Sequence, residues 1–417
     1  MSPTPPVQEH GHGRSIERWH GAQRVRKRPN PGSSGGHSPS QLRAPAYETH
    51  IFDFESRANQ DIIVTVRGYA GDLTAVTTTA EVTLVVVPRE RFQMTRRSLE
   101  SIYANTDLPF TLVYVDGGSP AATRRYLAAQ ARERGFRLLR TDRYLTPNEA
   151  RNLGIAQATT RYIVFVDNDV LVTPGWLAAL VRCARETGAW AVGPLYCLGE
   201  FEQQTVHMTG GHAHIFEQDG ARRFLEDHRF LGKPLLQVRP ELRREPCEMV
   251  EFHCMLVASH VFQRLGPLDE GLKSALENPD FCMSVRQAGG EIYFEPAALV
   301  SYLPPPPLAW SDLPYFLRRW SHAWNRASLR RFREKWHLPE DDPNLTRQFK
   351  AWTRWRREGL VSPDSLLARA LRSRFGPLLA RSLSRIEAPL NRWFVHDRRA
   401  TSGQKQRPPE EGAARHD

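Results

Sequence analysis

The sequence lacks several features that define common classes of protein. It has five cysteines, and none of them forms a Cys-x-x-Cys pair, which argues against a zinc ribbon or a thioredoxin-like motif. An odd, scattered set of cysteines fits a reducing compartment. No apolar run approaches the ~18 residues of a membrane-spanning helix, and the N-terminus lacks the apolar core of a signal peptide. We therefore expect a cytoplasmic location, either free or at the inner face of the membrane.

The composition is sufficient for a sizeable hydrophobic core, but it does not identify a binding partner. The 417 residues are 40% hydrophobic, enough for one large domain or two medium ones. The 57 basic and 46 acidic residues leave a net charge of +11, with much of the excess near the two ends. A basic surplus suits a nucleotide phosphate, an anionic membrane surface or nucleic acid. No recognised nucleic-acid-binding motif accompanies the charge, so nucleic acid is not expected.

Composition shifts along the chain predict four regions. Residues 1–45 are rich in Pro, Gly, Ser, His and Arg, which predicts a disordered tail. Residues 46–80 contain two β-like runs separated by the turn signal Gly68–Asp72, which indicates a β-rich extension with a hairpin. The catalytic domain is expected over 81–340. Residues 341–417 are basic and read as helical or disordered.

From residue 81 onward, strand-like and helix-like segments alternate. Val82–Val87 is a continuous apolar, β-branched run, typical of a buried parallel strand. Further strands are predicted at 111–115, 136–140, 162–166, 252–257 and 291–295. Helices are predicted to begin near residues 95, 120, 147, 173 and 278. The alternation predicts an α/β fold with a mostly parallel central sheet flanked by helices, followed by a helical C-terminal extension.

Local signals place two of the helix starts. Thr146-Pro147-Asn148-Glu149 has the pattern of a capping box with proline at the first helical position. Ser119 is predicted to cap the helix that follows it, with Pro120 in the first turn of that helix.

Polar residues gather where the predicted strands end. Asp167-Asn168-Asp169 follows the strand at 162–166, and Asp116 ends the strand at 111–115. Pro88 and Arg89 follow the first strand. Arg151 and Asn152 lie on a helix that points to the same edge. Ligands of parallel sheets bind beyond the carboxyl ends of the strands, so these residues together indicate a binding site. Each of them alone has a structural explanation, as a turn residue, a helix cap or a surface ion pair.

Five motifs in order, VVVPRER, VYVDGGS, NEARNLGIA, VFVDNDV and the block from PLDEGLK to LVSY, resemble inverting family-2 glycosyltransferases of the GT-A fold. The resemblance covers about residues 82–338. It implies transfer of a sugar from a nucleotide-sugar donor to an acceptor hydroxyl with inversion. Asp167 and Asp169 would bind a divalent cation, Mn²⁺ or Mg²⁺, which suits carboxylate oxygens. The residues implied in donor binding are Pro88, Arg89, Asp116, Arg151, Asn152, Asp167 and Asn168.

The chain departs from the family at two positions. The family usually has an acid where Asn278 stands, so the catalytic base would be Glu277 or Asp280; Glu277 also has a purely electrostatic explanation at a helix start. Tyr302 stands where the family often has a metal-binding histidine, and a neutral tyrosine is a poor metal ligand.

Fewer sequence signals indicate which residues would contact the acceptor. Glu251 and His253 are predicted to line the acceptor pocket, although strand alternation explains them equally. The cluster His207, His212 and His214 either binds a metal or acceptor or decorates a loop. The sequence leaves the acceptor open: a glycan, a lipid-linked molecule or a small molecule, in the making of a cell envelope, a polysaccharide or a natural product.

Two questions stay open at this point. An apolar stripe beside arginines at 366–375 predicts either a helix packed on the domain or peripheral contact with an anionic membrane. A nucleotidyltransferase is the rival enzyme, but VVVPRERF lacks the glycines of its phosphate loop. The alternative that is not an enzyme is a protein that binds sugar nucleotides without catalysis. The departures from the family at Asn278 and Tyr302 favour this alternative.

Overall fold

The computed structural model describes residues 80–200, 204–304 and 308–360, together with the backbone of three short strands before residue 80. The tail predicted over 1–45 and the stripe at 366–375 lie outside the described residues.

The three short strands belong to the β-rich extension. They are β1 (His50–Ile51), β2 (Ile62–Val64) and β3 (Val76–Thr78). Strands β2 and β3 pair antiparallel, with Ile63 opposite Thr77, which is the pairing that the predicted hairpin requires. Strand β1 instead pairs antiparallel with β6 of the main sheet.

The main sheet has 11 strands in the order β1-β6-β5-β4-β7-β14-β9-β15-β13, with β10 on β9 and β8 on β15. A separate antiparallel pair is formed by β11 and β12. The bounds of these strands are β4 (Val82–Val87), β5 (Phe110–Gly117), β6 (Arg137–Thr141), β7 (Tyr162–Asp167), β8 (Val170–Val172), β9 (Ala191–Leu198), β10 (Thr205–Met208), β11 (Gly211–Gln218), β12 (Ala221–His228), β13 (Glu245–Cys247), β14 (Cys254–Ala258) and β15 (Ile292–Tyr302).

Strand directions divide the sheet into two parts. From β6 through β5 and β4 to β7 the strands are parallel, as the alternating sequence pattern predicts. Beyond β7, β14 is antiparallel to both β7 and β9, while β15 is parallel to β9. The α/β class is confirmed, with a sheet that is parallel in its first part and mixed in its second. Because β14 runs against β7, the residues that precede β14 lie at the carboxyl end of β7.

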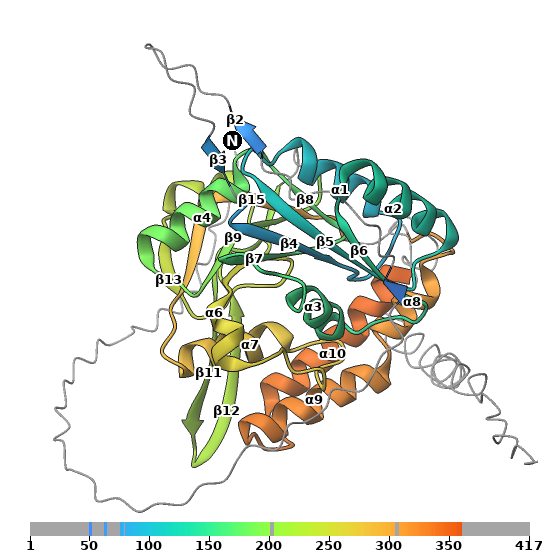
Figure 1. Cartoon of the computed structure of the whole chain (residues 1–417). Helices are drawn as coiled ribbons and strands as arrows, with labels where there is room; N and C mark the ends of the chain where they lie inside the picture. The colour runs from blue at the N-terminus through green and yellow to red at the C-terminus, as the bar shows by residue number, and fades with distance from the viewer. Residues whose placement is uncertain are drawn as a thin grey trace, which may run out of the picture. The chain divides into compact units, whose positions relative to one another are not determined.

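Helices cover both faces of the sheet, with α1, α2 and α4 on one side and α3, α6 and α7 on the other (Figure 1). Contacts agree with this division: Trp176 Nε1, at the start of α4, donates to Thr106 just after α1, and Asn152 of α3 bonds the Leu268 carbonyl between α6 and α7. The helices are α1 (Thr95–Ala104), α2 (Ala121–Arg134), α3 (Pro147–Ile155), α4 (Trp176–Thr187), α5 (Leu235–Val238), the 3-10 helix η2 (Arg239–Glu241), α6 (His260–Leu265), α7 (Glu277–Gln287), α8 (Leu313–Arg319), α9 (His322–Trp336) and α10 (Pro343–Leu360).

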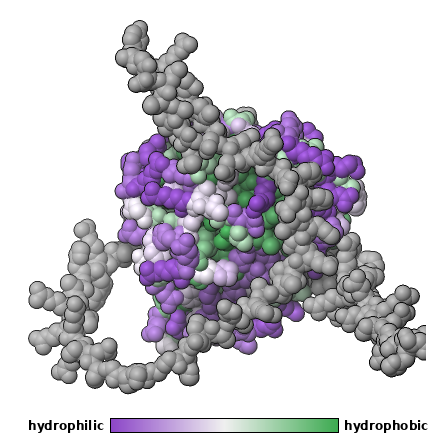
Figure 2. Space-filling model, viewed as in Figure 1, coloured by the Kyte–Doolittle hydropathy of each residue, from purple (hydrophilic) through white to green (hydrophobic). Residues whose placement is uncertain are grey.

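The core lies between the sheet and these helices. Every residue of β4 and of β7 is buried, which is why both strands read as continuous apolar runs. Gly154 lets α3 approach β4 closely, since a Cβ at this position would lie 2.2 Å from Val85 Cγ1. On the face of the molecule that Figure 2 shows, hydrophilic residues dominate the margin and apolar residues gather near the centre.

One of the two predicted helix caps is confirmed. The Thr146 hydroxyl accepts from Glu149 N at 3.4 Å, and Glu149 Oε2 accepts from Thr146 N at 2.8 Å, which completes the capping box of α3. The prediction for Ser119 is wrong. Its hydroxyl donates to Asp116 Oδ2 at 2.8 Å, and the N-cap of α2 is Pro120, without a side-chain cap.

The packed part of the chain continues past residue 340. Asp342 accepts a hydrogen bond from Phe224 N of β12 at 3.0 Å, and Leu345 of α10 is fully buried in the main core. Within the described ranges, no helix combines the length and the apolar character needed to cross a membrane.

Candidate active site

The predicted site lies at one edge of the sheet. Because β4, β5 and β7 are parallel, their carboxyl ends meet at the same edge. This brings together the segment after Val87, the turn at Asp116 and the Asp167–Asp169 turn. The antiparallel β14 adds a fourth element, because Asp167 N donates to the His253 carbonyl at 3.0 Å.

Asp167 is fully buried and surrounded by cationic and polar partners. Its Oδ1 accepts from Arg151 Nη2 at 3.4 Å, and its Oδ2 accepts from Arg89 Nη1 at 3.3 Å and lies 3.2 Å from His253 Nδ1. Burial alone would raise the pKa of this carboxyl group. The interaction with His253 and the charges of the two arginines outweigh burial and lower the pKa of Asp167 to about 2. Asp167 is therefore a carboxylate whose charge the chain itself compensates.

Asp169, two residues further on, is in the opposite situation. It is fully buried, and within the described part of the chain neither of its carboxyl oxygens has a hydrogen-bond partner. Burial and the neighbouring charges of Glu90 and Asp167 raise the pKa of Asp169 well above its usual value, against the smaller opposing effects of Arg89 and Arg91. A buried carboxyl group of this kind is stable only when it is protonated or binds a cation.

Glu90 is a site residue that we did not predict. It is fully buried, and its Oε2 accepts from the Tyr302 hydroxyl at 2.9 Å. Its Oε1 lies 3.5 Å from Arg89 Nε but makes no hydrogen bond within the described ranges. The sequence signal for this residue is the glutamate within the motif PRER, directly after the first strand. The unsatisfied oxygens of Asp169 and Glu90 fit a divalent cation, whose preferred ligands are carboxylate oxygens.

Several predicted donor-binding residues make hydrogen bonds within the protein around the site. Asp116 accepts from Ser119 N and Oγ at 2.9 and 2.8 Å and pairs with Arg140, so both of its oxygens serve the turn after β5. The Asn168 amide accepts from Arg89 N at 3.0 Å and donates to the Arg91 carbonyl at 2.8 Å.

Asn152 and Pro88 are engaged in the same way. The Asn152 amide bonds both the amide and the carbonyl of Leu268, each at 2.9 Å. The Pro88 carbonyl accepts from the Tyr315 hydroxyl of α8 at 3.1 Å. Asn152 links α3 to the segment between α6 and α7, and Pro88 links the segment after β4 to α8. Arg89 and Arg151 supply positive charge beside Asp167.

The two predicted catalytic acids on α7 contact different parts of the protein. Glu277 is buried, and its Oε1 accepts from Arg319 Nη2 at 3.2 Å and lies 3.9 Å from Arg151 Nη1. The shared contact with Arg151 links Glu277 to Asp167. Asp280 instead accepts from Trp336 Nε1 and Lys335 Nζ, both at 2.8 Å. The structure brings Glu277 to the site and directs Asp280 to α9.

Asn278 lies in the first turn of α7. Helix α7 begins at Glu277, and its N-cap is Leu276, whose φ is +68°. The Asn278 side chain accepts from Phe252 N at 3.1 Å and donates to Glu251 Oε1 at 3.3 Å. It therefore connects α7 to the segment that carries Glu251 and His253.

The histidine-rich segment separates into two groups. His207 points to Glu251, with Nε2 and Oε2 2.7 Å apart. His214 Nδ1 lies 2.6 Å from Glu248 Oε2, and His212 is half-exposed at 3.8 Å from the same oxygen. Only His207 joins the site, because β10 and β11 present their side chains to different neighbours.

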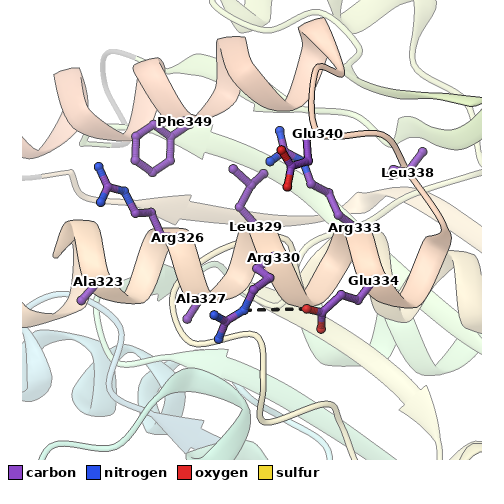
Figure 3. Close-up of a pocket in the computed structure, with 10 residues that line it drawn as sticks. All are labelled: Ala323, Arg326, Ala327, Leu329, Arg330, Arg333, Glu334, Leu338, Glu340 and Phe349. Atoms are coloured by element: carbon purple, nitrogen blue, oxygen red, sulfur yellow. Dashed lines mark ion pairs between the residues drawn. The ribbon is translucent and has the colours of Figure 1, made fainter.

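A hollow on the surface lies away from these residues. It has a volume of about 720 Å³ and lies on α9 and α10, where Arg326, Leu329 and Arg333 point from α9 toward α10 (Figure 3). None of its lining residues belongs to the strand ends. The buried charges described above, and not this hollow, define the candidate active site.

Comparison with known proteins identifies the domain. Residues 83–234 match the model of "Glycosyl transferase family 2". The chain is 25% identical over 224 residues to a pre-mycofactocin glycosyltransferase of Mycobacterium tuberculosis, covering 53% of this chain and 42% of that protein. It is 34% identical over 115 residues to the succinoglycan biosynthesis protein ExoO of Rhizobium meliloti, covering 28% of this chain and 33% of that protein. The chain thus spans less than half of either relative.

Solved structures resemble the chain only distantly. A crystal structure of GalNAc-T7 with UDP, GalNAc and Mn²⁺ aligns with a TM-score of 0.43 and 16% identity, covering 66% of this chain and 56% of that one. Staphylococcus aureus TarS aligns with a TM-score of 0.38 and 16% identity, covering 57% and 38%. The family match rests on sequence, and its residues include β4, β5, β7 and the Asp167–Asp169 turn. Residues 83–234 of the chain are therefore similar in sequence to family-2 glycosyltransferases.

Proposed function

We propose that this protein transfers a sugar from a nucleotide-sugar donor to an acceptor hydroxyl, with inversion and with the help of a divalent cation. The observation that carries the proposal is Asp169, a fully buried carboxyl group without a hydrogen-bond partner among the described residues, inside a family-2 domain. Glu90 adds a second unsatisfied carboxyl oxygen to the same edge. GalNAc-T7, a distant structural relative, was crystallised with UDP and Mn²⁺.

The residues at the strand ends would share the work of donor binding. Asp169 and Glu90 would hold the cation, which neutralises charge on the diphosphate leaving group. Arg89, 14% exposed at its side chain, supplies a fixed positive charge at the mouth of the site. Its guanidinium lies 5.2 Å from the centre of the Tyr302 ring. Asp167 keeps Arg89 and Arg151 in place, because it accepts from both of them.

Inversion requires a single displacement with a base beside the acceptor hydroxyl. We assign this role to Glu277. Both arginine contacts that reach it involve Oε1, so Oε2 is the oxygen that would take the proton. The same contacts leave Glu277 joined to Asp167 through Arg151, which would hold the base at a set distance from the donor half of the site.

The test is a donor screen with the full chain. UDP-, GDP- and dTDP-sugars are incubated with Mn²⁺ or Mg²⁺, and release of the nucleoside diphosphate is measured with and without a chelator. We expect release from one class of donor, lost on chelation. Binding of a donor without any release would favour the non-catalytic alternative. Release of pyrophosphate from a sugar phosphate and a nucleoside triphosphate would favour a nucleotidyltransferase.

A further inference from the structure

A second group of metal-ligating side chains lies beside the donor site, which it meets where His253 Nδ1 approaches Asp167 Oδ2 to 3.2 Å. His207, Glu251 and His253 each offer one ligand atom, and the three atoms lie within 4.8 Å of one another. We propose that these three residues bind a divalent transition-metal ion, separate from the cation at Asp169. The proposal goes beyond sugar transfer and does not depend on it.

The spacing of the ligand atoms fits such an ion. Glu251 Oε2 lies 2.7 Å from His207 Nε2 and 3.6 Å from His253 Nε2. Two ligands about 2.0–2.1 Å from a tetrahedral ion stand about 3.3 Å apart, a value between these two distances. Two imidazoles and one carboxylate are a ligand set typical of zinc sites that keep an open fourth position.

His253 and Glu251 are each oriented by a neighbour that leaves the ligand atom directed toward the other ligands. His253 Nδ1 lies 3.2 Å from Asp167 Oδ2. The negative charge of Asp167 beside Nδ1 favours the tautomer with its hydrogen on Nδ1, which leaves the lone pair of Nε2 on the side of Glu251. Two acceptors then face each other at 3.6 Å, and a cation between them removes the repulsion. A carboxylate behind a histidine is the usual support of a metal-binding imidazole.

Glu251 is held in the same manner. The amide of Asn278 donates to its Oε1 at 3.3 Å, which leaves Oε2 to face the two imidazoles. The Tyr196 hydroxyl lies 3.0 Å from Glu251 N and 2.8 Å from its carbonyl, so the backbone is fixed as well. His228 is a further neighbour of this carboxylate. Its Nε2 lies 3.8 Å from Glu251 Oε1 and 3.3 Å from Glu226 Oε1.

The fold redirects His207 for this position. The pairing of β10 with β9 shifts register between Val206 and Met208, which marks a bulge at His207. Bulges change the direction of a side chain and are common beside active sites. His207 is also the ligand nearest to solvent, 18% exposed at its side chain, and so gives an ion a route of entry.

The experiment uses the full chain, stripped of metal with a chelator, and Co²⁺ as the probe in the absence of nucleotide. We expect about one Co²⁺ to bind with the visible absorption bands of imidazole coordination, and Zn²⁺ to displace it. H207A and H207Q should both lose these bands; H207Q keeps a hydrogen-bonding group beside Glu251 and guards against a simple loss of fold, which thermal melting checks.

Two matched variants make the result specific. H214A removes an imidazole that contacts Glu248 and should keep the bands, and D169N should keep them too. Bands that are absent in the wild type, or unchanged in both His207 variants, would overturn the proposal. Bands lost in D169N would assign the ion to Asp169 and overturn it as well. Co²⁺ binding without donor turnover would contradict the proposed function alone, and turnover without the bands would contradict this site alone.

Discussion

Buried acids at the donor side of the site and on α7 differ in their hydrogen bonding. At the ends of β4 and β7, Asp169 and one oxygen of Glu90 have no hydrogen-bond partner in the part of the chain that the structure describes. On α7, Glu277 accepts from Arg319, and Asp280 accepts from both Lys335 and Trp336. Burying an ion without a partner is costly. We therefore assign the cation to the carboxyl oxygens that accept no hydrogen bond, whereas side chains of the protein itself compensate the two acids on α7.

Substitution of Asp169 is the most direct test of this difference between unpaired and paired acids. D169A removes the unpaired carboxyl group, so metal-dependent binding of the nucleoside diphosphate should fall below detection in calorimetry, and turnover should fall with it. The far-UV circular dichroism should not change, because the side chain bonds nothing in the described structure. D280N serves as the control and should bind donor normally. Donor affinity equal to that of the wild type in D169A would remove the cation from this position.

Glu277 tests whether a paired acid on α7 also does chemistry. Removal of a general base costs ~10²–10⁴ in rate, so E277Q should lower turnover by at least the smaller factor, while donor affinity holds. The amide keeps an acceptor for Arg319, so the fold should persist. A normal rate in E277Q together with a lost rate in D280N would exchange the two roles, and normal rates in both would place the base elsewhere.

Asp167 and Asp169 allow the comparison to be measured as stability. D167N takes a full negative charge away from two arginines and from His253. Loss of one partner of a buried ion pair costs about 3–5 kcal/mol, so the free energy of unfolding should fall by about that amount in urea denaturation. D169N removes an uncompensated buried acid and should leave the metal-free protein equally or more stable. Equal losses in the two variants would contradict the contrast between these aspartates.

Asp280 should give the smallest effect. D280N keeps an acceptor for Trp336 but loses the ion pair with Lys335, whose side chain is 31% exposed, so about 1 kcal/mol or less of stability should be lost at neutral pH. Burial raises the pKa of Asp280 above its usual 3.8, against the opposing effect of Lys335. The folded protein therefore holds this proton more tightly than the unfolded chain does.

The raised pKa of Asp280 makes the stability of the protein depend on pH. The contribution of the Asp280 proton to stability is complete below the unfolded pKa, near 3.8, and is lost as the pH rises through the folded-state pKa. Wild type should exceed D280N in stability by more at about pH 4 than at about pH 7. Urea denaturation of both proteins at the two values checks this, and a constant difference would contradict it.

Local sequence patterns determined much of the fold. Continuous apolar runs identified β4 and β7, and the capping box identified the start of α3, because strand burial and helix capping depend on neighbouring residues. The motif order also determined which loops carry the site, because parallel strands present their carboxyl ends at one edge. These features required no knowledge of distant contacts.

The roles of individual side chains were decided by tertiary structure alone. In the letters DND, the two aspartates are equivalent, yet one of them meets Arg89 and Arg151 and the other meets no hydrogen-bond donor among the described residues. Their difference comes from residues 16 and 78 positions away in the chain. Likewise His207 joins Glu251, 44 positions distant, only because β14 runs antiparallel to β7 and β10 bulges on β9. A one-dimensional pattern specifies which groups are available, but the charge that each group faces depends on which strands the folded sheet places side by side.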